Sequence, residues 1–286
     1  MPVIEYDPSR SALYTPARRP TVFEPGADYS SLQIAVEAAR LAYLNAAQAE
    51  NSAEDHQALV SALACVGMSA PRLFSDEETG TFGFGCRRAS DGMALLSFRG
   101  TQPEDIGDIV TNLEINTVAW TESSGRVHSG FATAMRSVIP EIQSWLDVDC
   151  AGRRELVICG HSLGAALATL AATLWRPDVL VTLGSPRVGN AAFAQSLDNV
   201  KIVRMVDCCD AVTRIPPETP WYTHVGTEHY INRAGGMVKS PDEEYVSDDC
   251  VHAREAYLAQ HAWKSGAVLV RDLADHSPIN YVRAVW

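Results

Sequence analysis

The sequence lacks the cysteine spacing that a disulfide framework or a zinc site shows. Its seven cysteines are an odd number and include no Cys-x-x-Cys pair, so neither structure is expected. No metal and no other cofactor is predicted. The cysteines are scattered along the chain: Cys65, Cys86, Cys150, Cys159, Cys208, Cys209 and Cys250.

Basic clusters are also missing. The formal net charge is −12, and lysine and arginine come together only in the pairs at 18–19, 87–88 and 153–154. A nucleic-acid-binding face needs concentrated positive charge, so nucleic acid is excluded as a partner. The acidic balance favours solubility, and no segment indicates an obligate protein partner.

Long hydrophobic runs and a recognisable leader are absent as well. No stretch approaches the roughly 18 apolar residues of a membrane span. The first residues, Met1 to Pro8, show no basic region followed by an apolar one, which a signal peptide would require. We therefore expect a cytoplasmic location, although a removed leader or leaderless secretion would give the same sequence.

The composition is that of a globular chain. Of the 286 residues, 47% are hydrophobic and 20% are charged, which argues against disorder. This length suits one large α/β enzyme domain, and no linker composition marks a boundary. Residues 1–29 are rich in proline and have no periodicity, so we predict an irregular arm, followed by a single domain over 30–286.

Hydrophobic periodicity predicts elements whose order defines the fold class. After helices at 30–47 and 53–64, a β-hairpin is predicted near 82–86 and 93–98, with its turn at Asp91-Gly92. Helices then alternate with short apolar strands. The strands are predicted at 156–159, 179–183, 201–206 and 227–232, and the helices at 130–146, 163–175, 190–197, 250–264 and 278–285. This alternation is typical of an α/β fold with a mostly parallel central sheet and helices on both faces.

One serine lies at the junction of a predicted strand and a predicted helix. Ser162 stands between Gly160 and Gly164, after the strand at 156–159. This Gly-x-Ser-x-Gly setting is typical of a nucleophile elbow, a sharp turn that leaves room only for glycine two residues either side of the serine. We therefore predict that Ser162 is a catalytic nucleophile.

A serine nucleophile needs a histidine to take its proton and a carboxylate to orient that histidine. In strand–elbow–helix hydrolases the chain order is serine, acid, histidine. Asp207 and Asp210 both follow the predicted strand at 201–206. Asp207 continues the strand, whereas Asp210 lies in a loop where its side chain is free to turn, so we predict Asp210 as the acid.

Five histidines follow Asp210, and one of them has the setting that a catalytic base needs. His276 lies in a loop between two predicted helices, and catalytic side chains are concentrated on such loops. We predict His276 as the base. The alternatives are His224 in an aromatic loop, His229 in a predicted strand, and His252 and His261 on a predicted helix.

The negative charge that develops on a substrate oxygen needs two N–H donors. The residue after the nucleophile, Leu163, should supply one of them, because it begins the helix. The second should come from a loop after an earlier strand. Thr101 follows the predicted strand at 93–98, so we predict an oxyanion hole of Thr101 and Leu163.

Several separate motifs together resemble the class 3 lipases, the family of the filamentous-fungal triacylglycerol lipases, over residues 30–282. The resemblance implies an α/β-hydrolase fold, the triad Ser162, Asp210 and His276, and the same oxyanion hole. The motifs are Ser97-Phe98-Arg99-Gly100-Thr101, Val127-His128-Ser129-Gly130-Phe131, Gly160-His161-Ser162-Leu163-Gly164-Ala165, 182–190 and 210–217.

The function that this resemblance implies is hydrolysis of carboxylic esters of lipids, as by a triacylglycerol lipase. A carboxylesterase, a feruloyl esterase or a phospholipase A1 would use the same triad and remains an alternative. A lipase-like binding protein without catalysis is the alternative from another class, and it is disfavoured because all three triad positions are filled.

The family also implies a lid after the oxyanion strand, here residues 102–126. Apolar residues at 106, 109, 110 and 113 follow helical spacing, which predicts a short amphipathic helix. We expect this lid helix to cover the acyl cleft and to allow transient contact with a lipid–water interface. An ordinary surface helix packed on the core would show the same pattern.

Overall fold

The computed structural model describes residues 3–44, 52–101 and 115–286. Within these residues an eight-stranded sheet has the order β1-β2-β3-β6-β7-β8-β9-β10. Strands β3, β6, β7, β8 and β9 run parallel, and the remaining strands join antiparallel at the edges. The bounds are β1 (Arg72–Asp76), β2 (Thr81–Arg88), β3 (Met93–Phe98), β6 (Glu155–His161), β7 (Val179–Leu183), β8 (Lys201–Asp207), β9 (Thr227–Ile231) and β10 (Met237–Lys239). The predicted mostly parallel sheet is therefore confirmed.

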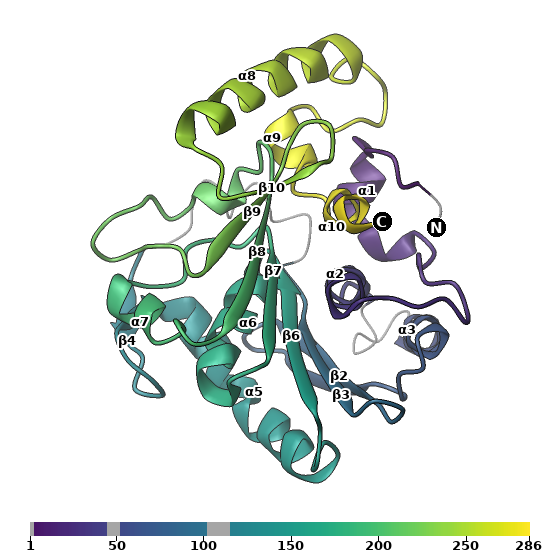
Figure 1. Ribbon diagram of the computed structural model, residues 1–286, viewed down its shortest axis with the longest axis vertical. Helices are drawn as coiled ribbons and strands as arrows, with labels where there is room; N and C mark the ends of the chain where they lie inside the picture. The colour runs from purple at the N-terminus through teal and green to yellow at the C-terminus, as the bar shows by residue number, and fades with distance from the viewer. Residues whose placement is uncertain (1–2, 45–51, 102–114) are drawn as a thin grey trace.

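Helices cover both faces of this sheet (Figure 1). Helices α5 and α6 pack on one face, and α2, α3 and α10 lie on the other. The bounds are α1 (Arg10–Tyr14), α2 (Ser31–Leu41), α3 (Ser52–Cys65), α5 (Ser129–Val148), α6 (Leu163–Trp175), α7 (Ala191–Gln195), α8 (Glu243–Gln260), α9 (Arg271–Ala274) and α10 (Pro278–Val282).

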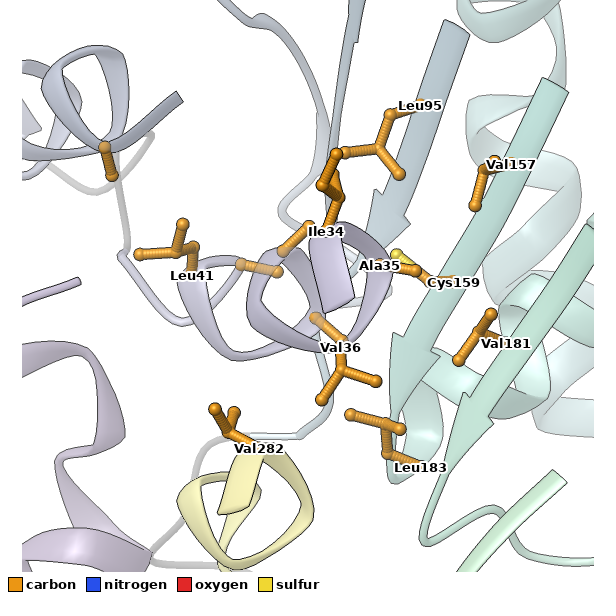
Figure 2. Packing of buried hydrophobic residues seen from close by; sticks show 14 of the residues in the cluster. Ile34, Ala35, Val36, Leu41, Leu95, Val157, Cys159, Val181, Leu183 and Val282 are labelled. Carbon is orange, nitrogen blue, oxygen red and sulfur yellow. The ribbon is translucent and has the colours of Figure 1, made fainter. Parts of the chain in front are cut away.

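The apolar strands are continuous because each face has its own core. Successive side chains of a strand point to opposite faces, so Leu95 packs with α2 whereas Leu96 packs with α5 and α6. Figure 2 shows Ile34 and Val36 of α2 directed toward the buried side chains of the central strands. Burial on both faces explains why these strands are mostly apolar, and their buried polar members include Ser97 and Thr182.

Side-chain caps fix where several helices begin. Ser30 caps α2 through a capping box with Gln33, in agreement with the predicted start of that helix. Asp242 accepts a hydrogen bond from the N–H of Tyr245 and starts α8 well before the predicted residue 250. The polar first turns of α8 hid this start, because they carry no apolar periodicity.

The amino-terminal arm is more ordered than predicted. Residues 10–14 form helix α1, and Ser9 caps it. The guanidinium of Arg40, buried on α2, donates to the backbone carbonyls of Pro16 and Arg19. These long-range bonds hold the arm in place, and no local pattern in the sequence predicts them.

The predicted lid divides into two parts. The apolar positions 106–113 lie outside the described residues. Residues 117–119 and 126–128 form the short antiparallel hairpin of β4 (Thr117–Ala119) and β5 (Arg126–His128). The far end of the predicted lid segment is thus a hairpin on the body of the molecule. None of the helices in the described ranges is both long and apolar enough to cross a membrane.

A buried ion pair on α2 generates a stability prediction. Glu37 and Arg40 are fully buried and bonded to each other, and Glu37 also accepts from Thr21 and the N–H of Val22. Glu37→Ala leaves Arg40 charged and unpaired, which should lower the free energy of unfolding by about 3–5 kcal/mol.

Urea denaturation followed by circular dichroism measures this loss. Glu255→Ala, which removes an exposed carboxylate on α8, is the matched control and should change little. Equal stability of Glu37→Ala and the control would contradict the structural role of the pair.

Candidate active site

Ser162 occupies a strained turn between β6 and α6. Its backbone has φ 58° and ψ −128°, a region that non-glycine residues enter only when surrounding structure enforces it. The N–H of Ser162 donates to the carbonyl of Leu183 on the neighbouring strand β7, at 2.9 Å. The turn therefore has the position and the backbone strain of a nucleophile elbow.

Two glycines make this turn sterically possible. A Cβ atom on Gly160 would collide with the carbonyl of Gly164, and one on Gly164 would collide with the carbonyl of Phe98 on β3. Strand β6, helix α6 and strand β3 thus meet through backbone alone. The Gly-x-Ser-x-Gly spacing in the sequence reflects this close crossing.

The structure places His276 against Asp210. The Nδ1–H of His276 donates to Oδ2 of Asp210 at 2.8 Å, and both side chains are fully buried. His276 follows α9 and precedes α10, and Asp210 follows β8, as the predicted loops required. Among the described residues the buried Nε2 of His276 has no hydrogen-bond partner, so this nitrogen can accept a proton.

Two further bonds hold the carboxylate of Asp210. Its Oδ1 accepts from the N–H of Val212 at 2.8 Å, and its Oδ2 accepts from the hydroxyl of Tyr281 at 2.5 Å. The same hydroxyl accepts from the N–H of Asp207 at 3.1 Å. Tyr281 thus holds both the end of β8 and the carboxylate of Asp210, a contact that sequence reasoning missed.

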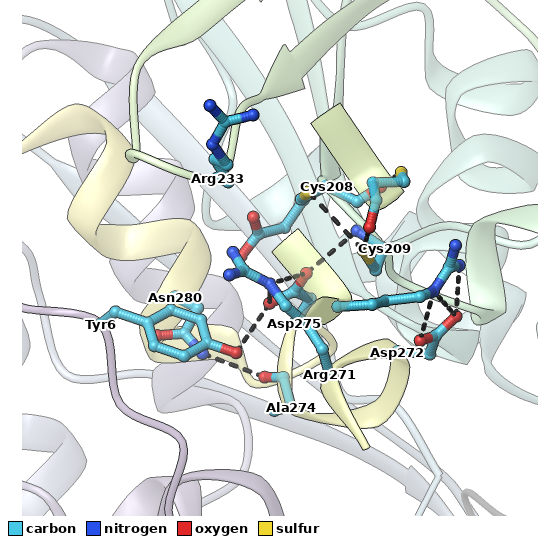
Figure 3. A network of polar contacts seen from close by, with 12 residues as sticks. Tyr6, Cys208, Cys209, Arg233, Arg271, Asp272, Ala274, Asp275 and Asn280 are labelled. Carbon is cyan, nitrogen blue, oxygen red and sulfur yellow. Dashed lines mark hydrogen bonds and ion pairs between the residues drawn. The ribbon is translucent and has the colours of Figure 1, made fainter. Parts of the chain in front are cut away.

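The loops that carry Asp210 and His276 are also bonded to each other through the residue that precedes each of them, Cys209 and Asp275 (Figure 3). Asp275 accepts from the N–H of Cys209 at 2.9 Å, and Tyr6 of the amino-terminal arm donates to the same carboxylate at 2.8 Å. Arg271 completes an ion pair with Asp275 at 3.1 Å. This network fixes the separation between the two loops.

His161 connects Ser162 to His276. Its ring lies 4.5 Å from the ring of His276, centroid to centroid. Its Nε2–H donates to the backbone carbonyl of His276 at 2.8 Å, and its Nδ1 accepts from the hydroxyl of Tyr43 at 2.7 Å. Since His161 precedes Ser162 directly, these bonds place the His276 loop beside the elbow.

The expected oxyanion donors belong to two backbone segments, one that begins at Ser162 and one that passes close to it. Leu163 is the first residue of α6, where backbone N–H groups have no partner within the helix. A Cβ atom on Gly100 would come within 3.0 Å of Cβ of Ser162, so the backbone after β3 runs past the serine. Thr101 follows immediately and is half-buried.

The other candidates from the sequence lie elsewhere. Asp207 is fully buried near Arg283, at 3.8 Å, and burial together with Asp275 raises the pKa of its carboxyl well above the usual range. His224 bonds to the carbonyl of Thr213, and burial lowers its pKa to about 3. The structure pairs neither with His276.

The remaining histidines also have other partners or positions. His229 bonds to the carbonyl of Thr227 on its own strand. His252 is exposed on α8 and bonds to the carbonyl of Asp248, and His261 stacks near Tyr257 at the end of that helix.

The sheet, the elbow and the likeness to solved lipases define an α/β-hydrolase fold. A solved lipase from Rhizopus microsporus var. chinensis superposes with a TM-score of 0.58 at 25% identity, over 74% of this chain and 80% of that one. The model of the lipase (class 3) family matches residues 95–219. This segment is similar to the class 3 lipase family, and His276 and Tyr281 lie beyond it.

Two curated relatives agree with this assignment. A lipase of Rhizopus niveus is 28% identical over 186 residues, which are 59% of this chain and 46% of the relative. A secreted mono- and diacylglycerol lipase of Fusarium solani is 35% identical over 128 residues, which are 42% of this chain and 37% of the relative. The chain thus spans about half the length, or less, of the curated relatives it matches.

The expected cytoplasmic location is wrong. The relative from Fusarium solani is named a secreted lipase, and a similar relative from Penicillium cyclopium bears the same description. These relatives point to an extracellular location. The absence of a recognisable leader was too weak a signal to decide the compartment.

The environment of His161 generates a pH prediction. Burial, followed by the nearness of His276, lowers the pKa of His161 well below its ordinary value of 6.5. Below about pH 6.5 the His161 imidazole therefore binds a proton in the unfolded chain but not in the folded chain. This difference destabilises the folded state. As the pH falls, the free energy of unfolding of the wild type should decrease by up to about 1.4 kcal/mol per pH unit relative to that of His161→Gln, which cannot take up that proton.

Urea denaturation of both proteins between about pH 7.5 and pH 5 measures the difference. The destabilisation caused by His161→Gln should shrink as the pH falls. A difference that stays constant across this range would contradict the neutral, buried state of His161.

Proposed function

We propose that this protein hydrolyses carboxylic esters of lipids, with Ser162 as nucleophile, His276 as base and Asp210 as the acid that orients it. The observation that carries the proposal is the hydrogen bond between His276 and Asp210 beside the strained turn at Ser162. The relatives named above are lipases, which supports lipid esters as the substrate class.

The chemistry is transfer of an acyl group to water. His276 Nε2 takes the proton of the Ser162 hydroxyl, and the serine oxygen attacks the ester carbonyl. His276 then gives the proton to the leaving alcohol. His276 then deprotonates a water molecule, which attacks the acyl-serine and releases the carboxylic acid product from Ser162. Asp210 stabilises the imidazolium and holds its tautomer without being protonated itself.

The N–H groups of Leu163 and Thr101 are proposed to bind the oxyanion. Leu163 begins a helix whose positive dipole end faces the elbow, and charge that develops there is stabilised without reorganisation. Because Gly100 has no side chain, the backbone that leaves β3 can pass close to Ser162. Removal of one such donor typically lowers turnover about 100-fold or more.

The proposed nucleophile is tested with Ser162→Ala. This variant should lose at least about 1,000-fold in turnover, because the reacting oxygen is gone. A fluorophosphonate should label the wild type at Ser162 and leave the variant unlabelled. Ser137→Ala, which removes a half-buried hydroxyl on α5, is the control and should retain full activity.

The assay should cover short p-nitrophenyl esters, triolein and phosphatidylcholine. Hydrolysis of triolein by the wild type is the expected result. Activity confined to water-soluble short esters would contradict the lipid substrate, and unchanged turnover in Ser162→Ala would contradict the proposed nucleophile.

The contact between Tyr281 and Asp210 generates a further prediction. Tyr281→Phe removes one bond to the acid and keeps the ring. Turnover (kcat) should fall on the order of 10-fold with KM nearly unchanged, because a hydrogen bond to a charged group contributes about 1.5–3 kcal/mol.

Tyr257→Phe is the matched control, since its buried hydroxyl bonds to the carbonyl of Val268, outside the proposed site. Steady-state kinetics of the two variants against the wild type provide the comparison. Equal turnover in both variants would show that Tyr281 has no part in positioning Asp210.

A further inference from the structure

Three buried cysteines gather behind the loop that carries Asp210. Cys208 and Cys209 follow strand β8, and Cys250 lies on helix α8. Their sulfur atoms all lie within 4.8 Å of one another, and each residue is at most 3% exposed. Among the described residues no other group of three metal-ligating side chains converges in this way.

The spacing of the Cys208 and Cys209 sulfur atoms suits two ligands of a tetrahedral metal ion. Sγ of Cys208 and Sγ of Cys209 are 3.7 Å apart (Figure 3). Two thiolates bound to zinc at about 2.3 Å each, in tetrahedral geometry, stand about 3.8 Å apart. A disulfide would instead require the two sulfur atoms to approach to about 2.05 Å.

The backbone at Cys208 is bent so that the two neighbouring side chains meet. Successive side chains of an extended strand point to opposite sides, yet these two sulfur atoms lie on the same side. Cys208 has φ 23°, an unfavourable value for a residue with a side chain. The tight turn in which the N–H of Asp210 donates to the carbonyl of Asp207 holds this conformation.

A carboxylate and two arginines surround the sulfur atoms. Oδ2 of Asp249 lies 3.4 Å from Sγ of Cys208, and Arg233 pairs with the same carboxylate at 3.1 Å. Arg214 approaches Sγ of Cys250 at 3.5 Å. Three thiolates and one carboxylate carry four negative charges, which two arginines and one divalent ion would balance. The three thiols donate hydrogen bonds to Asp249 and to the carbonyls of Cys250 and Cys208, and a metal ion would displace these protons.

The cluster has a route to solvent. A surface cavity of about 400 Å³ is lined by Cys250 together with Arg214, Glu228 and Glu243. An ion can therefore reach the sulfur atoms from this side without unfolding the sheet.

We propose that Cys208, Cys209 and Cys250 bind one zinc ion as thiolates. Binding releases the three thiol protons to solvent, and no electron is transferred. The three thiolates are the protein ligands, and a water molecule would complete the tetrahedral coordination. The ion links α8 to the chain segment that leads into Asp210.

No motif in the sequence indicates this site, and the expectation of no metal rested on the lack of such a motif. Cys250 is 41 residues from Cys209 in the chain, and the two other ligands are adjacent rather than two residues apart. The usual Cys-x-x-Cys pattern, in which two residues separate the cysteines, is therefore absent, and only the fold brings the ligands together.

Metal analysis of the wild-type protein is the first test. The full chain is incubated with zinc under reducing conditions, passed through a desalting column and examined by plasma mass spectrometry. The expected result is one zinc ion per chain. Replacement by cobalt should give intense thiolate-to-cobalt charge-transfer absorption, which water or carboxylate ligands alone do not produce.

Cys250→Ser tests the ligand set, and Cys150→Ser is the control because Cys150 is buried outside the cluster. Cys250→Ser should bind zinc more than about 100-fold more weakly, since even loss of an outer-shell partner costs 10- to 100-fold. The control should keep its zinc. A chelator should lower the melting temperature of the wild type and of the control.

Two results would overturn the proposal. One is a zinc content near zero in the wild-type protein after this treatment. The other is a disulfide between two of the three cysteines, detected by peptide mass spectrometry in protein that carries no zinc and shows no cobalt absorption. Neither measurement depends on ester hydrolysis, so failure here is separate from failure of the proposed activity.

Discussion

The close crossing of β6, α6 and β3 is the constraint on which the rest of the site depends. Gly160 and Gly164 let three backbones meet where any side chain would collide, and the turn between them forces Ser162 into a left-handed conformation. Such strain persists only where the surrounding packing enforces it. The buried sheet and the small-residue face of α6 supply that packing.

The second requirement is that two distant loops arrive beside this turn. Asp210 and His276 are 66 residues apart in the chain, yet their side chains are bonded. The bond does not stand alone, because Asp275 is bonded to Cys209 one residue upstream of each partner. Tyr6 reaches the same carboxylate from the other end of the chain. The amino-terminal arm thus contributes to the geometry of the proposed site.

Much of this architecture was predictable from local pattern. The continuous apolar strands, the capped start of α2 and the loop positions of Asp210 and His276 all follow from residue type and spacing. Strand β1 escaped prediction because it lies at a sheet edge and buries only Phe74 fully. Helix α1 and the order of the arm escaped because the bonds from Arg40 that hold them come from distant sequence.

The supporting groups of the site were less accessible to sequence reasoning. Tyr43 and Tyr281 lie on different parts of the chain and act through hydroxyl contacts that no periodicity encodes. The three cysteines at the end of β8 had no motif either. In each case the function of the side chain depends on a tertiary contact, and the sequence carries only its residue type.

The most direct measurement of the central claim is a crystal structure of the protein after reaction with an alkyl phosphonate ester. We expect a covalent bond from Oγ of Ser162 to phosphorus. We also expect the phosphoryl oxygen to accept from the N–H groups of Leu163 and Thr101, with Nε2 of His276 directed at the serine oxygen. A phosphonate bound at another residue, or a phosphoryl oxygen turned away from both N–H groups, would contradict it.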